Sequence, residues 1–231
     1  KIKNQEKIPP TLADKVIAHL FFENSTRTKL SFEVAAKRLG AIVINFDAES
    51  SSVSKGESLE DTMSVFNALG TDIGVIRHTD DLFVEGLIKK EQFSIINAGA
   101  GKNEHPSQSL LDLFTIKEEF GKIEGLNITI CGDILNSRVA KSNITALEKF
   151  NCKINLCGPS EFLPKKEDLP SHCHIKDLDN AIQETDVLML LRVQHERHGL
   201  YEFDVNNYNL SLIHISEPTR RTPISYAVFC L

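Results

Sequence analysis

The feature that most constrains the fold is a repeated alternation of short apolar runs with helical patterns. Runs of the buried-strand type, rich in Ile and Val, occupy residues 16–21, 41–46, 73–76 and 93–96. Apolar residues with helical spacing fill 28–39 and 59–69, and a glycine follows each of these segments. Buried strands separated by helices are typical of a parallel sheet with helices on its faces. The first half of the chain is therefore predicted to be a layered α/β domain.

A second α/β series follows a long helical pattern at 106–120, which has Pro106 in its first turn. Its strands are predicted at 128–131, 153–157 and 187–191, with a helix at 137–150. Because glycines interrupt the pattern between the two series, we predict a domain boundary near Gly121. The expected architecture is α/β with two domains, 1–120 and 121–210, each a mainly parallel sheet with helices on both faces. Residues 211–231 show no helical or strand period, since two prolines and an arginine pair interrupt them.

Charge and composition exclude several classes of protein. The 231 residues contain 26 Lys and Arg against 32 Asp and Glu, a formal net charge of −6, which argues against a general nucleic-acid-binding protein. No apolar run approaches the roughly 18 residues of a membrane-spanning helix, and residues 1–10 lack the apolar core of a secretory signal. The 5 cysteines are irregularly spaced and odd in number, which argues against a disulfide framework. We expect a reduced, cytoplasmic protein with no nucleic-acid or membrane partner.

The most informative motif is Ser25-Thr26-Arg27-Thr28, which lies between a predicted strand and the start of a helix. Backbone N–H groups are free at the beginning of a helix, where the helix dipole also favours negative charge. Hydroxyl groups and a guanidinium at that point favour a cradle for a phosphate or another oxyanion. The alternative is a plain Ser or Thr cap with a solvated arginine.

Further polar residues fall at the carboxyl ends of predicted strands, where open α/β sheets bind their ligands. Each has a plain alternative, such as a surface salt bridge or a capping residue. Repetition of arginine at equivalent points nevertheless favours a small and highly anionic ligand. The candidates are Arg77, His105, Gln108, Arg138, Arg192 and Gln194.

Other residues and motifs of the sequence bear on this interpretation. His105 could donate a hydrogen bond to a carbonyl oxygen or act as an acid or base. Lys55, on a polar loop with Ser51, could close over an anion, although such a composition also fits a simple surface loop. Glycine fingerprints for dinucleotides, a P-loop and a G-x-S-x-G motif do not occur, so no cofactor is predicted. A metal is not predicted either, because Cys173 should point away from His172 and His174 in a strand and Cys152 and Cys157 lack zinc-site spacing.

Several longer stretches resemble one known family. They are FFENSTRTKLSFEVAAKRLGA, SSVSKGESLEDT, VIRH, INAGAGKNEHPSQSLLDLFTI, GDILNSRVAKSN and LRVQHER. Together they resemble the catalytic chains of aspartate carbamoyltransferases, within the aspartate/ornithine carbamoyltransferase family. The STRT and HPxQ elements are shared by carbamoyltransferases at large, whereas LRVQxER and the KGE loop point to the aspartate enzymes. Ornithine enzymes typically have Cys at the position of Ser107.

The resemblance implies an activity and a role for each candidate residue. Carbamoyl phosphate and L-aspartate would give N-carbamoyl-L-aspartate and phosphate, an early step of pyrimidine synthesis. The phosphate would be held by Ser25, Thr26, Arg27 and Thr28. The catalytic residues would be Arg27, Thr28, Arg77 and His105, since Arg77, Thr28 and His105 reach the carbonyl oxygen. Gln108 would orient the carbamoyl amide, while the carboxylates of aspartate would be held by Arg138, Arg192 and Gln194.

The resemblance also implies an assembly and a truncation. Ser51 and Lys55 lie on the loop that enters a neighbouring subunit's site in this family, which implies a homotrimer with shared active sites, and a regulatory chain is a further partner to consider. The first domain is shortened at its start, the second is incomplete after the Tyr208 region, and residues 211–231 form an out-of-family tail. Two alternatives therefore stay open: an inactive fragment that only binds carbamoyl phosphate or another anion, and a carbamoyltransferase with a different amino-acid acceptor.

Overall fold

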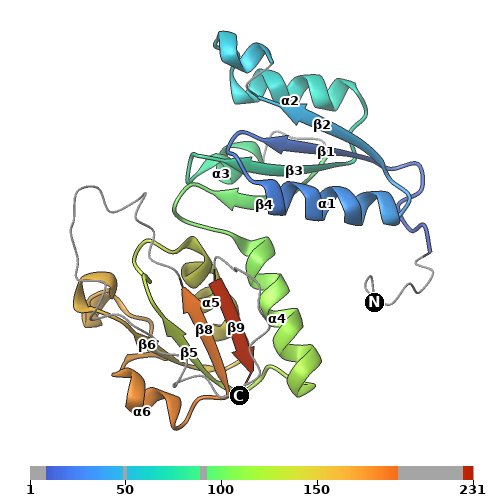
Figure 1. Ribbon diagram of the computed structural model, residues 1–231. Helices are drawn as coiled ribbons and strands as arrows, with labels where there is room; N and C mark the ends of the chain where they lie inside the picture. The colour runs from blue at the N-terminus through green and yellow to red at the C-terminus, as the bar shows by residue number, and fades with distance from the viewer. Residues whose placement is uncertain (1–8, 49–50, 89–92, 192–225, 231) are drawn as a thin grey trace. The chain divides into compact units, whose positions relative to one another are not determined.

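A computed structural model describes residues 9–48, 51–88, 93–191 and 226–230 (Figure 1). The chain divides into two compact units, Lys1–Ser107 and Gln108–Leu231. Each unit is built on a sheet with helices against it, which confirms the α/β class and the two-domain organisation. None of the described helices is long and apolar enough to cross a membrane.

The first unit contains a wholly parallel sheet of four strands in the order β2-β1-β3-β4. The strands are β1 (Val16–Phe21), β2 (Ile42–Asp47), β3 (Ile73–His78) and β4 (Ser94–Ala100). The helical segments are α1 (Thr26–Arg38), the 3-10 turn η2 (Ser52–Lys55), α2 (Leu59–Ala68) and α3 (Phe83–Leu87). All four strands predicted for this half of the chain are present, β4 extending further than the sequence pattern indicated.

Helices cover both faces of this sheet because alternate residues of its central strands point in opposite directions. Ile17 and Val75 pack with Ala36 of α1 on one face. Leu20 and Ile76 pack on the other face with residues of α2 and α3, including the fully buried Met63. The apolar runs of β1 and β3 are continuous for this reason, as expected for strands buried on both sides.

The second unit contains a sheet of five strands in the order β7-β6-β5-β8-β9, in which only β9 runs antiparallel. Its strands are β5 (Asn127–Cys131), β6 (Lys153–Cys157), β7 (Cys173–Ile175), β8 (Val187–Leu191) and β9 (Tyr226–Cys230). Its helices are α4 (Pro106–Phe120), α5 (Arg138–Glu148) and α6 (Leu178–Ile182), with 3-10 turns η3 (Ser160–Phe162) and η4 (Lys166–Asp168). Residues of α4 and α5 pack on one face of the sheet and residues of α6 on the other.

The two units divide earlier in the chain than the sequence predicted, because α4 packs on the second sheet. Sequence patterning placed the boundary near Gly121, between domains 1–120 and 121–210, with the helix at 106–120 as the bridge between them. Leu113 and Ile116 of α4 are instead buried in the core of the second unit, with Ile128 and Ile130 of β5. Since burial of these apolar side chains fixes α4 to the second sheet, the units divide near the start of that helix, between Ser107 and Gln108.

Four short elements were missed from the sequence: α3, β7, α6 and β9. The first three contain 5, 3 and 5 residues, too few to display a hydrophobic period. Residues 211–231 showed no helical or strand period in the sequence, yet Tyr226–Cys230 pair antiparallel with β8. Three of the five residues in this segment, Tyr226, Val228 and Phe229, are aromatic or β-branched, and pairing satisfies the backbone groups along the edge of β8.

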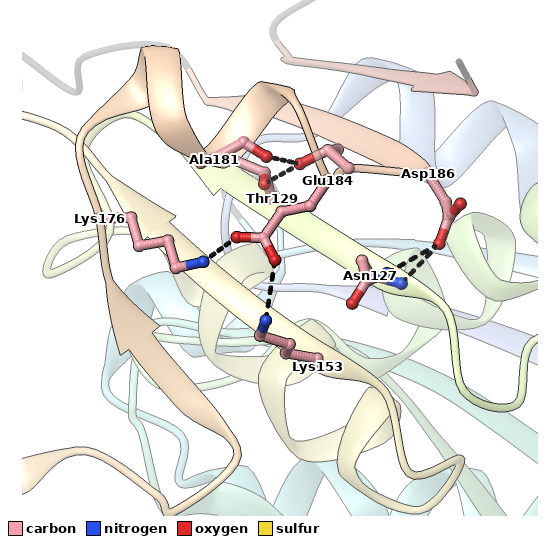
Figure 2. Close-up of polar contacts among 8 residues, drawn as sticks. Asn127, Thr129, Lys153, Lys176, Ala181, Glu184 and Asp186 are labelled. Atoms are coloured by element: carbon pink, nitrogen blue, oxygen red, sulfur yellow. Dashed lines mark hydrogen bonds and ion pairs between the residues drawn. The ribbon is translucent and has the colours of Figure 1, made fainter.

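Polar contacts hold the turn that leads from α6 to β8 against its neighbours (Figure 2). The carboxylate of Glu184 accepts hydrogen bonds from Lys153 and Lys176. Thr185 Oγ1 donates to the carbonyl of Ala181 at 2.6 Å and lies 2.5 Å from Thr129 Oγ1. These contacts fix the start of β8, and so its register beside β5.

Candidate active site

The carboxyl ends of the first sheet meet at one edge, because all four of its strands are parallel (Figure 1). The chain leaves β1 toward β2 on one side, whereas β3 lies on the other, so the order reverses at β1. Open α/β sheets bind ligands outside the carboxyl ends at such a reversal. The register pairs Phe21 with Arg77 and His78 with Ala100. Arg77 and the segments that carry Arg27 and His105 therefore begin at this same edge.

Residues 25–28 form the beginning of α1, as the sequence predicted. Ser25 occupies the N-cap position, and its side chain makes no capping hydrogen bond within the described residues. Acidic residues do not occur in the first turn of α1, while Lys37 and Arg38 occupy its last turn. The positive end of the helix dipole is thus uncompensated by the capping side chain beside Thr26, Arg27 and Thr28. This arrangement favours an anion site over a plain serine cap.

Arg77 is held at the end of β3 by an acidic residue that sequence reasoning missed. Arg77 is 7% exposed, and its Nη2 donates to Glu23 Oε1 at 3.0 Å. Glu23 lies two residues before Ser25, so the ion pair joins β3 to the loop that opens α1. The signal in the sequence was a carboxylate next to a predicted phosphate loop, where it would repel an anion unless it served an arginine.

His105 comes directly before α4 and is 7% exposed. Its Nδ1 lies 3.3 Å from Ser107 Oγ. Gln108, in the first turn of α4, belongs to the second unit, and its Nε2 donates to Asp112 Oδ1 at 3.2 Å. Asp112 Oδ2 in turn accepts from Asn143 Nδ2 at 2.8 Å. Asp112 and Asn143 were not singled out in the sequence, yet they orient the amide of a candidate residue.

Ser51 and Lys55 follow β2 and lie on a loop with its own hydrogen bonds. Ser51 Oγ donates to the carbonyl of Ala48 at 2.9 Å and accepts from the backbone N–H of Val53 at 3.2 Å. Lys55 is exposed at the end of η2, followed by Gly56 with φ of +96°. The glycine permits a left-handed turn that presents the lysine side chain to solvent.

Arg138 and Gln108 are the two candidate site residues of the second unit that lie within the described residues. Arg138 is the first residue of α5, follows the carboxyl end of β5 and is 6% exposed. Ser137 caps that helix by accepting from the N–H of Ala140 at 3.1 Å. The ends of β5 and β8 approach closely, since a Cβ on Gly132 would lie 2.5 Å from the carbonyl oxygen of Leu191. Arg192 and Gln194 lie outside the described residues, so their roles stay predictions.

The cysteine and histidine cluster considered for metal binding is not arranged as one site. Cys173 is buried in β7, whereas His174 is exposed, as the alternation of strand residues predicted. Burial raises the pKa of the Cys173 thiol to about 11 and that of Cys157 to about 12, so both remain protonated near neutral pH. These thiols therefore lack the thiolate character of a nucleophile.

Comparisons with known proteins agree with the motifs. The family described as "Aspartate/ornithine carbamoyltransferase, carbamoyl-P binding domain" matches residues 1–118. The catalytic subunit of M. jannaschii aspartate transcarbamoylase is 41% identical, with a TM-score of 0.77 over 90% of this chain and 69% of that chain. Aspartate transcarbamoylase from Trypanosoma cruzi in complex with N-(phosphonacetyl)-L-aspartic acid is 34% identical, with a TM-score of 0.77 over 86% of this chain and 68% of that chain. The same enzyme in complex with carbamoyl phosphate and aspartate is 34% identical, with a TM-score of 0.76 over 86% of this chain and 66% of that chain.

Proposed function

The chain belongs to the aspartate/ornithine carbamoyltransferase family, and we propose that it transfers the carbamoyl group of carbamoyl phosphate to the amine of L-aspartate. The observation that carries the proposal is the meeting of the start of α1, Arg77 and the segment before His105 at one edge of the first sheet. The products are N-carbamoyl-L-aspartate and phosphate, and the pathway we propose for them is pyrimidine synthesis.

The phosphate group of carbamoyl phosphate is assigned to the start of α1. Backbone N–H groups and the hydroxyls of Ser25, Thr26 and Thr28 donate to its oxygens there. Arg27 supplies a planar fork of N–H donors and a positive charge, which suits a phosphate better than a point charge does. Arg77, held by Glu23, reaches the same ligand from the end of β3.

The chemical step is attack of the aspartate amine nitrogen on the carbonyl carbon. Negative charge then builds on the carbonyl oxygen, where Thr28, Arg77 and His105 donate hydrogen bonds. A preorganised donor of this type is worth roughly 3–4 kcal/mol of transition-state stabilisation. Collapse of the tetrahedral intermediate breaks the bond between carbon and the phosphate oxygen. The departing phosphate accepts the amine proton, so this step requires no side-chain base.

The second unit is assigned to the amino-acid acceptor. Arg138, with Arg192 and Gln194, would bind the two carboxylates of aspartate, while Gln108 would orient the carbamoyl amide. Two anionic substrates account for arginines in both units of a chain whose net charge is −6. Holding both substrates in contact converts a bimolecular reaction into a local one.

The assembly we propose is a homotrimer in the cytoplasm, in which Ser51 and Lys55 complete a neighbouring subunit's site. Lys55 is exposed and lies on a loop with internal hydrogen bonds, which suits a group that acts outside its own unit. A regulatory chain is a further partner proposed for this assembly. Sedimentation of the 231-residue chain, with and without carbamoyl phosphate, tests the trimer directly.

The activity is tested by measuring N-carbamoyl-L-aspartate from carbamoyl phosphate and aspartate, with ornithine as the competing acceptor. Arg27→Ala should lower kcat/KM by roughly 100-fold or more. Arg38→Ala, an exposed arginine at the other end of α1, is the matched control and should stay within about twofold. Preference for ornithine would contradict the acceptor assignment. Tight calorimetric binding of carbamoyl phosphate without turnover would instead support the alternative of an anion-binding fragment.

A further inference from the structure

Two turns meet beyond the ends of β3 and β4, and neither contains a residue of the site described above. The first turn, residues 79–82, follows Arg77 and His78. The second, residues 101–104, leads directly to His105. The N–H of Gly101 donates to the carbonyl of His78 at 2.9 Å. The N–H of Lys102 donates to Asp81 Oδ1 at 2.6 Å, a charge-assisted hydrogen bond between the two turns.

The fit between these turns requires a glycine. Gly101 has φ of +40°, and a Cβ at that position would overlap Asp81 Oδ1. The same Cβ would also lie 2.6 Å from the carbonyl oxygen of Thr79. The carboxylate of Asp81 therefore packs directly on the backbone of the second turn, in addition to accepting its N–H.

Backbone hydrogen bonds between Ala100 and Glu104 close the second turn, so we expect a displacement of one part to shift the whole turn. The N–H of Ala100 donates to the carbonyl of Glu104 at 2.9 Å, and the N–H of Glu104 donates back to Ala100 at 3.1 Å. His105 follows at once, and the ring of Pro106 then restricts the backbone into α4. A displacement of Gly101 and Lys102 is consequently transmitted to the His105 imidazole.

The first turn is equally well fixed, and its anchor is the end of β3. The backbone N–H of Asp80 donates to His78 Nδ1 at 2.9 Å. The His78 ring packs against Phe22 and Phe83, with centroids 5.1 and 5.7 Å away. Asp81 thus extends from a rigid support that begins next to Arg77.

From these contacts we propose that Asp81 is a positioning residue, whose carboxylate sets the location of His105 relative to Arg77 by holding the turn at Gly101 and Lys102. The inference rests on the proposed function, because it is His105 and Arg77 that donate to the reacting carbonyl oxygen. Displacing such a donor by about 1 Å can slow a reaction roughly 100-fold. Asp81 is exposed and is assigned no contact with substrate.

The test compares three variants at neighbouring positions of the full chain. Asp81→Ala removes the acceptor, and we expect kcat to fall about 10- to 100-fold while KM for aspartate changes by less than about threefold. Asp81→Asn keeps an acceptor oxygen and should retain at least about a third of kcat. Asp80→Ala removes an adjacent carboxylate that bonds only within its own turn, and should stay within about twofold. Equal losses in all three variants, or no loss in Asp81→Ala, would overturn the inference.

A spectroscopic measurement keeps the two proposals separate. The His105 imidazole resonances should move on addition of carbamoyl phosphate to the parent, and that response should be lost in Asp81→Ala and kept in Asp80→Ala. An unchanged response in Asp81→Ala would overturn the positioning role, whereas no response in the parent would overturn the proposed function. The Lys102 amide should also exchange with solvent at least about 10-fold more slowly than an unprotected amide, and rapid exchange would contradict the hydrogen bond even if Asp81→Ala failed to fold.

Discussion

Removal of Glu23 should loosen the ends of β1 and β3 by an amount that the geometry of the Arg77 ion pair sets. The two charged atoms are 3.0 Å apart, with the arginine side chain 9% exposed and the glutamate side chain 29% exposed. At an effective dielectric constant of about 20, Coulomb attraction at that separation is about 5 kcal/mol. Desolvation of both ions offsets much of it, and net values for charged hydrogen bonds are about 1.5–3 kcal/mol. We therefore expect Glu23→Ala to cost about 2 kcal/mol.

Native-state hydrogen exchange of the amides in β1 and β3 measures this cost where it arises. A loss of about 2 kcal/mol corresponds to exchange about 30-fold faster. Glu23→Gln keeps an acceptor for Arg77 Nη2 and should show about half the loss. Glu33→Ala is the matched control, because Glu33 pairs with Lys37, whose side chain is 60% exposed, and such helix pairs contribute about 0.3–0.5 kcal/mol. Exchange in Glu23→Ala no faster than in Glu33→Ala would show that the ion pair between Glu23 and Arg77 does not stabilise the ends of β1 and β3.

Three further predictions follow from burial and backbone geometry. Desolvation lowers the pKa of the buried His19 and the half-buried His78 below the ordinary value of about 6.5, so the folded chain binds fewer protons than the unfolded chain below that pH. Urea unfolding should therefore show stability falling from pH 7.5 to 5.5. A flat profile, or stability that rises as the pH falls, would be inconsistent with neutral, desolvated rings. Gly132 has φ of +132°, and Gly132→Ala would place a Cβ 2.5 Å from the carbonyl oxygen of Leu191. This substitution should destabilise the second unit by about 2 kcal/mol or more in urea unfolding. Stability equal to that of the parent would mean that β5 and β8 end farther apart. Burial raises the pKa of Cys157 to about 12 and that of Cys173 to about 11. Alkylation of both thiols at pH 8, mapped by mass spectrometry, should therefore be at least about 100-fold slower than in the unfolded chain. Rapid labelling of the native chain would contradict their burial.

Long periodic segments were predictable from the sequence because burial on two faces leaves a continuous apolar signal. Val16–Phe21 and Val187–Leu191 were placed with the bounds that the structure has, as was the helix Pro106–Phe120. The domain to which that helix belongs was not predictable. Leu113 and Ile116 indicate that one face of the helix is buried, but they do not indicate which of the two sheets it packs against. Tyr226–Cys230 was missed because a strand at a sheet edge depends on the neighbouring edge of β8, which no local pattern reveals.

Some residues of the candidate site could likewise be predicted from the sequence, and others could not. Ser25–Thr28 and Arg77 could be singled out as candidates because strand ends and helix starts are local features. Glu23 and Asp81 were not, because their partners lie far along the chain: Arg77 is 54 residues from Glu23, and Lys102 is 21 from Asp81. Polar contacts of this kind are created by the topology of the sheet. They become visible only when β1, β3 and β4 are placed side by side.

The proposed function requires that carbamoyl phosphate bind at the carboxyl edge of the first sheet. Amide resonances of the 231-residue chain, followed during titration with carbamoyl phosphate, report where the ligand binds. We expect shifts concentrated at residues 25–28, 77–78 and 101–105, with little change at Ile42 and Ile73, where β2 and β3 begin at the opposite edge. Shifts concentrated at that opposite edge, or none at saturating ligand, would contradict the proposed function.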